Sequence, residues 1–214
     1  VTLTASYSYD AVGNRLTKTT EGIVEKYKYN AKNQLKEISN NNEKTLFTYD
    51  LQGNTIKEET NRGNNIFEYN TLNQQVKAVT KEGNTLENRY DSEGLRYEIE
   101  ENEKLARFIF NKNGDILTET DSNDNIVSRF TRGYEIVSAD IKSNSPTNWN
   151  LKSTFENDEL ERYFYTVDEQ GSTTLITSNA ANICNEYYYD AFGNILESKE
   201  SVHNRITYTG QQFD

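Results

Sequence analysis

The chain has 214 residues and a net charge of −11, from 34 acidic and 23 basic residues. This charge repels a polyanion, so we expect no nucleic-acid partner. No apolar run approaches ~18 residues and no basic-then-apolar leader opens the chain, so the sequence predicts neither a membrane span nor a signal peptide within it. The single cysteine, Cys184, and the single histidine, His203, exclude an internal disulfide and a multi-histidine zinc site.

Composition also favours a β-structure. Aromatic residues make up 12% of the chain, with 15 tyrosines, and proline occurs once. Disordered chains are poor in aromatic residues, so the chain is expected to fold. Richness in Tyr, Thr and Asn with almost no Pro is typical of an all-β protein with many turns.

A repeat of about twenty residues begins near the N-terminus. Each unit has an aromatic anchor, an Asp or Asn directly after it, and a Gly or Asn four residues after it. The anchors are Tyr9, Tyr29, Tyr49, Tyr69, Tyr90, Phe110 and Tyr189. The turn residues are Gly13, Asn33, Gly53, Asn73, Gly94, Gly114 and Gly193. The first six anchors are 20 or 21 residues apart, so the pattern is a true repeat.

One unit reads as a β-hairpin. Aromatic residues two apart, such as Tyr27 and Tyr29, point to the same face of a strand. The following Asp or Asn opens a turn by hydrogen-bonding nearby backbone, and the Gly or Asn suits a positive φ. An aliphatic residue such as Ile56 then marks the second strand, and a second polar turn leads to the next unit. The sequence therefore predicts a long antiparallel meander of hairpins, each stacked on its neighbours.

The tyrosines have two interpretations. The first is a ladder of stacked rings that fills one face of the sheet, since cross-strand aromatic pairs stabilise sheets. The alternative is a row of exposed rings that stack on sugars. The Asp residues after the anchors interchange with Asn, which indicates a turn cap that needs an acceptor and not a charge.

The repeat register ends near residue 130. We therefore expect a regular array over 1–130 and a variant region over 131–214, with one sheet able to run through both. An irregular insertion is predicted at about 140–162, a stretch that holds Pro146 and Trp149. Strand-like sequence resumes at 163–165.

Several stretches carry a family resemblance. The repeat Y-D-x-x-G-N resembles the YD repeat of RHS and teneurin-type proteins. RFTRGYEIVS (129–138), YFYTVDEQGSTTLIT (163–177), EYYYDAFGNILES (186–198) and NRITYTGQQFD (204–214) occur in that order. Together they resemble the RHS-repeat-associated core of bacterial members, with its DxxGS motif at Asp168, Gly171 and Ser172 and its YTG motif at Tyr208 and Gly210. The long insertion and Phe110 in an anchor position depart from the family pattern.

This resemblance implies a hollow β-shell. In the bacterial toxin members, a spiral YD-repeat sheet encloses a C-terminal toxin and the associated core plugs one end. It further implies self-cleavage beyond the YTG motif. Because the chain stops at Asp214, we expect it to be a piece of a larger polypeptide that lacks the cleavage segment and the toxin.

The sequence contains few patterns that indicate a catalytic or metal-binding site. His203 lies beside a turn and no G-x-S-x-G elbow occurs, so a hydrolase triad is not predicted. The acidic residues Glu156, Asp158, Glu159 and Glu161 read as a solvated face. The stretch from Asp121 to Arg132 begins like a calcium loop, yet it lacks Gly and Glu at the sixth and twelfth positions. We therefore expect no cofactor and no metal, and no enzyme activity.

Three functional classes remain open. The leading hypothesis is a structural segment of a secreted or cell-surface bacterial shell that encapsulates a C-terminal toxin. Its partners would be the rest of the shell and the toxin domain. The second class is a cell-surface carbohydrate-binding or adhesion module with Trp149 as a glycan contact. The third, a glycosidase or self-processing enzyme, is the least favoured. Cut edges of a sheet pair readily, so self-association through them is also predicted.

Overall fold

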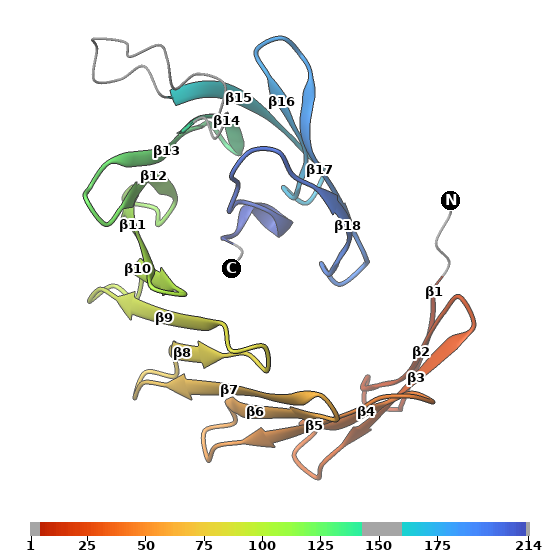
Figure 1. Ribbon diagram of the computed structural model, residues 1–214. Helices are drawn as coiled ribbons and strands as arrows, with labels where there is room; N and C mark the ends of the chain where they lie inside the picture. Colours follow the sequence, from red (N-terminus) through yellow and green to blue (C-terminus); the bar gives the residue numbers. More distant parts are fainter. Residues whose placement is uncertain (1–4, 143–159, 213–214) are drawn as a thin grey trace. The chain divides into compact units, whose positions relative to one another are not determined.

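The computed structural model describes residues 5–142 and 160–212, and their fold is all-β (Figure 1). Eighteen strands follow one another in these described residues, and each pair with an assigned register is antiparallel and adjacent in sequence. Within the described residues the only helical element is the short 3-10 turn η2 (Tyr208–Gly210). The predicted meander of hairpins is confirmed.

The chain divides into two compact units. Unit 1 comprises Val1–Tyr90 and Ile99–Lys104, and unit 2 comprises Asp91–Glu98 and Leu105–Asp214. The division falls inside β10 (Arg96–Glu101). The array over 1–130 and the variant region over 131–214 stay a prediction.

Unit 1 is built from four hairpins and the following strand. Its strands are β1 (Ala5–Tyr9), β2 (Arg15–Thr20), β3 (Ile23–Tyr29), β4 (Leu35–Ser39), β5 (Lys44–Tyr49), β6 (Thr55–Thr60), β7 (Gly63–Tyr69), β8 (Gln75–Val79) and β9 (Thr85–Tyr90). Strands of five to seven residues suit units of twenty residues, because each unit also holds two turns.

Unit 2 continues the same pattern. Its strands are β11 (Lys104–Phe110), β12 (Ile116–Asp121), β13 (Ile126–Arg132), β14 (Ile136–Lys142), β15 (Leu160–Val167), β16 (Thr173–Ser178), β17 (Ile183–Tyr189) and β18 (Ile195–Lys199). After β18 the C-terminal segment, residues 200–212, turns back over the unit (Figure 1).

The turns that follow the anchors share one backbone geometry. In the β5–β6 hairpin the register shifts between Thr48 and Tyr49, which is a bulge. Asp50 accepts the backbone N–H of Asn54 on its side chain at 2.8 Å, and Gly53 has a φ of +98°. A turn closed by a residue in the left-handed region is a common way to join two antiparallel strands. Asn33 and Asn73 occupy the same position with φ near +60°.

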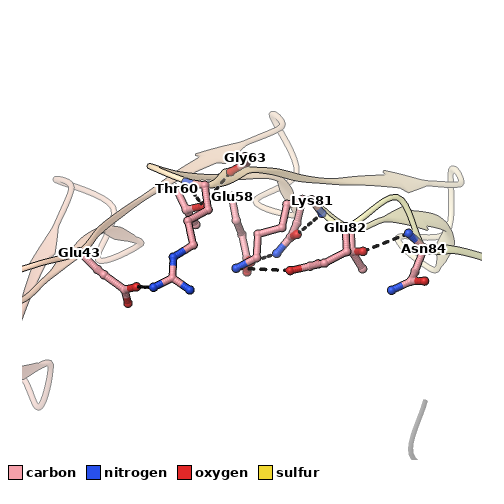
Figure 2. Close-up of polar contacts among 10 residues, drawn as sticks. Glu43, Glu58, Thr60, Gly63, Lys81, Glu82 and Asn84 are labelled. Carbon is pink, nitrogen blue, oxygen red and sulfur yellow. Dashed lines mark hydrogen bonds and ion pairs between the residues drawn. The ribbon is translucent and has the colours of Figure 1, made fainter.

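The opposite ends of the unit 1 hairpins are joined by polar contacts (Figure 2). Arg62 pairs with Glu43 of the preceding hairpin, 19 residues earlier. The backbone N–H of Lys81 donates to the side chain of Asn65 at 2.9 Å, and Asn65 donates to Glu58 at 2.9 Å. The Arg62–Glu43 and Lys81–Asn65 contacts span 19 and 16 residues, close to the period of the repeat, so successive units are linked at this end of the strands as well.

The ends of the predicted insertion are regular. Asp140 pairs with Arg162 in the β14–β15 ladder, and Lys142 pairs with Leu160. Pro146 and Trp149, and the acidic residues 156, 158 and 159, lie outside the described residues. Glu161 lies on β15 and accepts the Tyr163 hydroxyl at 2.8 Å.

Candidate functional site

The C-terminal segment and the strands beneath it hold most of the buried polar chemistry of unit 2. Glu119 on β12 is the centre of this region, with a side chain only 3% exposed. Arg205 donates from Nε to Glu119 Oε1 at 3.0 Å, and Ser128 donates to Oε2 at 3.0 Å. His203 Nε2 lies 2.9 Å from the same Oε2. A buried carboxylate on one strand is thus satisfied by two residues that follow it by more than 80 positions.

The electrostatics of this cluster favour the charged carboxylate. Burial raises the pKa of Glu119, but its contacts with His203 and Arg205 lower the pKa by more, so the net shift is downward. Desolvation of a carboxylate is unfavourable unless hydrogen bonds and opposite charges compensate it. Glu119 therefore fastens the C-terminal segment to β12 as an anion.

A second set of buried groups lies beside this cluster. Asn185 on β17, which is fully buried, donates to the Val202 carbonyl at 2.9 Å and accepts the Ser201 and Val202 N–H groups. Tyr165 donates to Asn204 at 2.9 Å. Every one of these contacts joins the C-terminal segment to a strand, so the segment is fixed by directional bonds along its length.

Burial raises the pKa of three tyrosines in this region. It raises the pKa of Tyr165 and of Tyr187 well above the usual range. It raises the pKa of Tyr189 to about 12. These hydroxyls therefore stay protonated at neutral pH: those of Tyr165 and Tyr189 donate hydrogen bonds, and that of Tyr187 accepts from Asn185 and Asn204.

The two motifs of the C-terminal resemblance meet in space. Asp168 accepts the N–H groups of Gln170 and Ser172, both at 2.9 Å. The Ser172 hydroxyl accepts the N–H of Thr209 in η2 at 3.1 Å. Gly171 and Gly210 approach closely: a Cβ at Gly210 would lie 3.5 Å from the Gly171 carbonyl oxygen.

Tyr208 occupies the space between two neighbouring hairpin turns. Its hydroxyl lies 3.2 Å from Gln170 Oε1 in the β15–β16 turn. A Cβ at Gly193 in the β17–β18 turn would lie 2.6 Å from the Tyr208 ring. The ring also contacts the anchor Tyr189, with centroids 5.6 Å apart. The close approach to Gly193 explains why this turn needs glycine for space as well as for its φ of +84°.

Several of the anchor tyrosines use their hydroxyls to bind a backbone carbonyl. Four of them donate to the backbone carbonyl of the first residue in the second strand of the preceding hairpin. The recorded pairs are Tyr29 with Arg15, Tyr49 with Leu35, Tyr90 with Gln75 and Tyr189 with Thr173, at 2.6–3.0 Å. Tyr69 is half-buried in its strand, and Tyr9 is 49% exposed.

Arg132 stands in an anchor position that the sequence analysis missed. The β13–β14 register shifts between Thr131 and Arg132, as it does before the tyrosine anchors. Arg132 Nε donates to the Ile116 carbonyl at 3.2 Å, the partner that an anchor hydroxyl would have. The signal in the sequence was Phe130-x-Arg132, which matches the aromatic-x-anchor spacing once a donor other than Tyr is allowed.

The arrangement does not form a nucleophilic triad. A serine, an acid and a histidine do come together, but Glu119 lies between the other two. Ser128 donates to the carboxylate and not to His203, and its side chain is buried. A triad needs the histidine next to the hydroxyl that it deprotonates.

The described residues contain no group of three or more His, Cys, Asp or Glu side chains that could hold a metal ion. The side chain of Asp121 accepts the N–H groups of Asn123 and Asn125, so it caps a turn. Cys184 is half-buried, with Sγ 3.6 Å from the Asn182 carbonyl oxygen. In the same part of the chain, no helix is long and apolar enough to cross a membrane.

Comparison with known proteins gives relatives of one kind. No established family profile matches the chain. The chain is 29% identical over 219 residues to the tRNA nuclease WapA of Bacillus subtilis, and 28% identical to the tRNA3(Ser)-specific nuclease WapA of Bacillus spizizenii. It is 29% identical over 193 residues to the tRNA(Glu)-specific nuclease WapA of Bacillus subtilis subsp. natto. These alignments cover 87–97% of the chain but only 7–8% of the relatives' length.

Solved structures also match the chain, at lower sequence identity. The crystal structure of TcdB2-TccC3 matches all of the chain and 17% of its own, at 12% identity and a TM-score of 0.43. The Photorhabdus luminescens Tc holotoxin pore matches with 13% identity and a TM-score of 0.41.

The expectation that the protein is not an enzyme is contradicted. It rested on the absence of a recognisable catalytic pattern in these 214 residues. The relatives that match nearly the whole chain are named as nucleases, so the comparison points to an enzymatic activity. A pattern search within the chain has no access to the more than nine-tenths of each relative that the alignment leaves out.

Proposed function

We propose that this chain is a YD-repeat segment of a larger bacterial nuclease toxin, and that its hairpin sheet forms part of a shell around a C-terminal toxin domain. The toxin acts on tRNA and the protein is secreted or held at the cell surface. The observation that supports this most is the hairpin repeat of the described residues, together with the match along 97% of the chain to a protein named as a tRNA nuclease.

The relatives' names favour a division of labour. The chain is about equally similar to a nuclease specific for tRNA3(Ser) and to one specific for tRNA(Glu). A segment that selected the tRNA would resemble one of them more than the other. We therefore assign the choice of tRNA to a part of the protein outside the matched segment, and the enclosing sheet to the segment.

The geometry of unit 2 supports the enclosing role. The C-terminal segment is fixed on the sheet by Glu119, by Asn185 and by the Ser172–Thr209 hydrogen bond. A wall that holds a second layer through buried directional bonds is rigid and excludes water. Such a wall is suited to keeping a partner chain away from proteases.

An exchange of segments tests the division of labour. The region that corresponds to this chain is swapped between the tRNA3(Ser)-specific and tRNA(Glu)-specific relatives, and tRNA cleavage is measured by gel. Both chimaeras should keep the specificity of the parent that supplies the rest of the protein. Specificity that moved with the segment would overturn the proposal.

Protease protection tests the shell. In the full-length protein, the C-terminal domain should resist a protease concentration that degrades the same domain expressed alone. Equal degradation of the enclosed and the free domain contradicts enclosure, whatever the cleavage assay shows.

A carbohydrate-binding role is the second candidate, favoured by one cavity. A space of about 500 Å³ lies between the β15–β16 and β17–β18 turns, with Tyr188, Tyr208 and Glu169 among its walls. Aromatic rings with nearby carboxylates and amides are the groups that bind sugars by stacking and hydrogen bonding. A glycan array run with the parent chain and with Tyr188→Ala tests it. Binding that Tyr188→Ala abolishes supports the role, and absence of binding across the array removes it.

A further inference from the structure

A smaller cavity in unit 2 is lined by donor side chains and one carboxylate. It has a volume of about 310 Å³ and lies between the β11–β12 turn and the end of the C-terminal segment. Phe110, Ile116 and Ile206 supply apolar surface, and the polar side chains include those of Arg132, Asp115 and Gln212. The Glu119 cluster and the Tyr188 cavity are separate from it, because neither contributes a residue to its walls.

Arg132 lines this cavity, and its guanidinium is incompletely hydrogen-bonded. Its Nε is used by the Ile116 carbonyl, at 3.2 Å. Its Nη1 lies 3.8 Å from Asp115 Oδ1, which is beyond hydrogen-bond distance, and Asp115 Oδ2 already accepts from Asn111 at 2.9 Å. The side chain is only 14% exposed, and burial lowers its pKa while leaving it charged. Asp115 is thus an ion-pair partner, but the Nη groups of Arg132 have no hydrogen-bond acceptor among the described residues.

Gln212 adds a second donor at the same place. Its backbone is held by a bridge to Ile206, which fixes the residue at the cavity wall. The side-chain Nε2 is inaccessible to solvent and has no hydrogen-bond partner among the described residues. Buried amide donors are nearly always paired in native proteins, so a side-chain turn that brought this amide to an acceptor in the cavity would satisfy it.

We propose that this cavity binds a carboxylate on a short aliphatic stem, namely an Asp or Glu side chain of a peptide segment. The planar fork of a guanidinium matches the two oxygens of a carboxylate. The apolar walls at Phe110, Ile116 and Ile206 suit a stem of one or two methylenes. The nearby Asp115 and the net charge of −11 disfavour a phosphate dianion. This inference stands apart from the proposed function, since it requires neither a nuclease nor a shell.

The binding test uses small probes on the 214-residue chain. N-acetylglutamate α-amide is titrated while the backbone amide shifts of Gly114, Thr209 and Gly210 are followed by NMR. We expect saturable shifts at millimolar concentration, and none with the neutral N-acetylglutamine α-amide. Equal shifts with both probes, or with neither, overturn the proposal. Tighter binding of inorganic phosphate than of the glutamate probe also overturns it.

Two substitutions separate ligand binding from a structural role. Arg132→Lys keeps the charge and loses the fork, so affinity for the glutamate probe should fall about tenfold. Asp115→Asn keeps an acceptor for Asn111 and removes the competing charge, so affinity should rise roughly fivefold. A purely structural role for Asp115 predicts weaker binding or none, which is the opposite sign.

Controls keep the result interpretable. Arg129→Lys changes an arginine that pairs with Asp140 and does not line the cavity, so probe affinity should be unchanged. If Arg132→Lys does not fold, Gln212→Leu removes the other donor near the end of the described chain and should weaken binding severalfold. Full affinity in Gln212→Leu together with no gain in Asp115→Asn rejects the site.

Discussion

The two units share one repeat and differ in what covers it. In unit 1 the buried apolar residues among those described are Tyr27, Ala78 and Ile99, whereas unit 2 holds the other twelve, including Phe108, Ile176 and Ile206. Unit 2 has the C-terminal segment lying on its strands, and unit 1 has no comparable described segment of its own. A hairpin repeat of this length therefore makes a sheet, and a second layer makes a core.

Unit 1 has few buried apolar residues, and hydrogen bonds between successive repeats link its hairpins. Its anchor hydroxyls reach back to the preceding hairpin, as Tyr29 and Tyr49 do. Its turns are linked by side-chain contacts, as Asn14 is to Asn33 and Asn54 is to Asn73. Each contact is exposed or half-buried, so we expect many small contributions there and a few large ones in unit 2.

The largest expected effect is at Glu119. Glu119→Gln removes the charge that Arg205 and His203 face, and loss of one partner from a buried pair destabilises by roughly 3 kcal/mol. Glu37→Gln is the matched change in unit 1, where the partners Lys28 and Lys44 are 65% and 55% exposed. Because solvent screens those partners, no measurable change in unfolding midpoint is expected. Chemical denaturation of both variants checks this, and equal effects would refute the contrast between the units.

The Glu119 carboxylate also makes the stability of the protein depend on pH. The pKa of Glu119 is lowered in the folded state from 4.5, so its stabilisation is present above pH 4.5 and is lost as pH falls through the folded pKa. The parent should therefore lose stability in acid more steeply than Glu119→Gln, and the two stability curves should converge at low pH. Hydrogen exchange of β12 and β17 amides between pH 3 and pH 7 measures it. Parallel curves would show that Glu119 does not carry the dependence.

A glycine pair compares a crowded turn with an open one. Gly193→Ala and Gly13→Ala meet similar positive φ values, +84° and +90°. An added Cβ at Gly193 lies 2.6 Å from the Tyr208 ring, while nothing lies within 4 Å at Gly13. We expect about 1 kcal/mol of destabilisation for Gly13→Ala from backbone strain alone, and roughly 2 kcal/mol or more for Gly193→Ala from strain and overpacking. Matching losses in thermal unfolding would show that Tyr208 moves aside freely.

These contrasts show which features of the structure could be predicted from the sequence. The hairpins and their turns were predictable because each depends on residues within about ten positions, such as Asp50, Gly53 and Asn54. The layer on unit 2 was not predictable, because Glu119 contacts residues 84 and 86 positions later and no local pattern encodes that pairing. Arg132 was missed because its role depends on a donor at an anchor position and not on the tyrosine that defines the repeat.

The enzyme expectation was wrong for a different physical reason. Composition and motif searches report on the residues present, and different segments of one protein need share neither composition nor motifs. The net charge of −11 argues against tRNA binding by this chain, and that exclusion stays a prediction about these 214 residues. The nuclease names belong to relatives of which this chain matches 7–8%.

The smallest expected effect tests the anchor rule in unit 1. Tyr49 donates to the Leu35 carbonyl at 2.6 Å and its ring is half-buried, so Tyr49→Phe removes one hydrogen bond and little packing. A loss of about 1 kcal/mol is expected. Tyr9→Phe is the control, because Tyr9 is 49% exposed and its hydroxyl has no recorded partner among the described residues. Urea unfolding monitored by hydrogen exchange of β4 and β5 resolves a difference of this size. If both variants behave like the parent, the anchors act through their rings alone, and the hydroxyl that separates Tyr49 from Phe110 contributes nothing to the stacking of repeats.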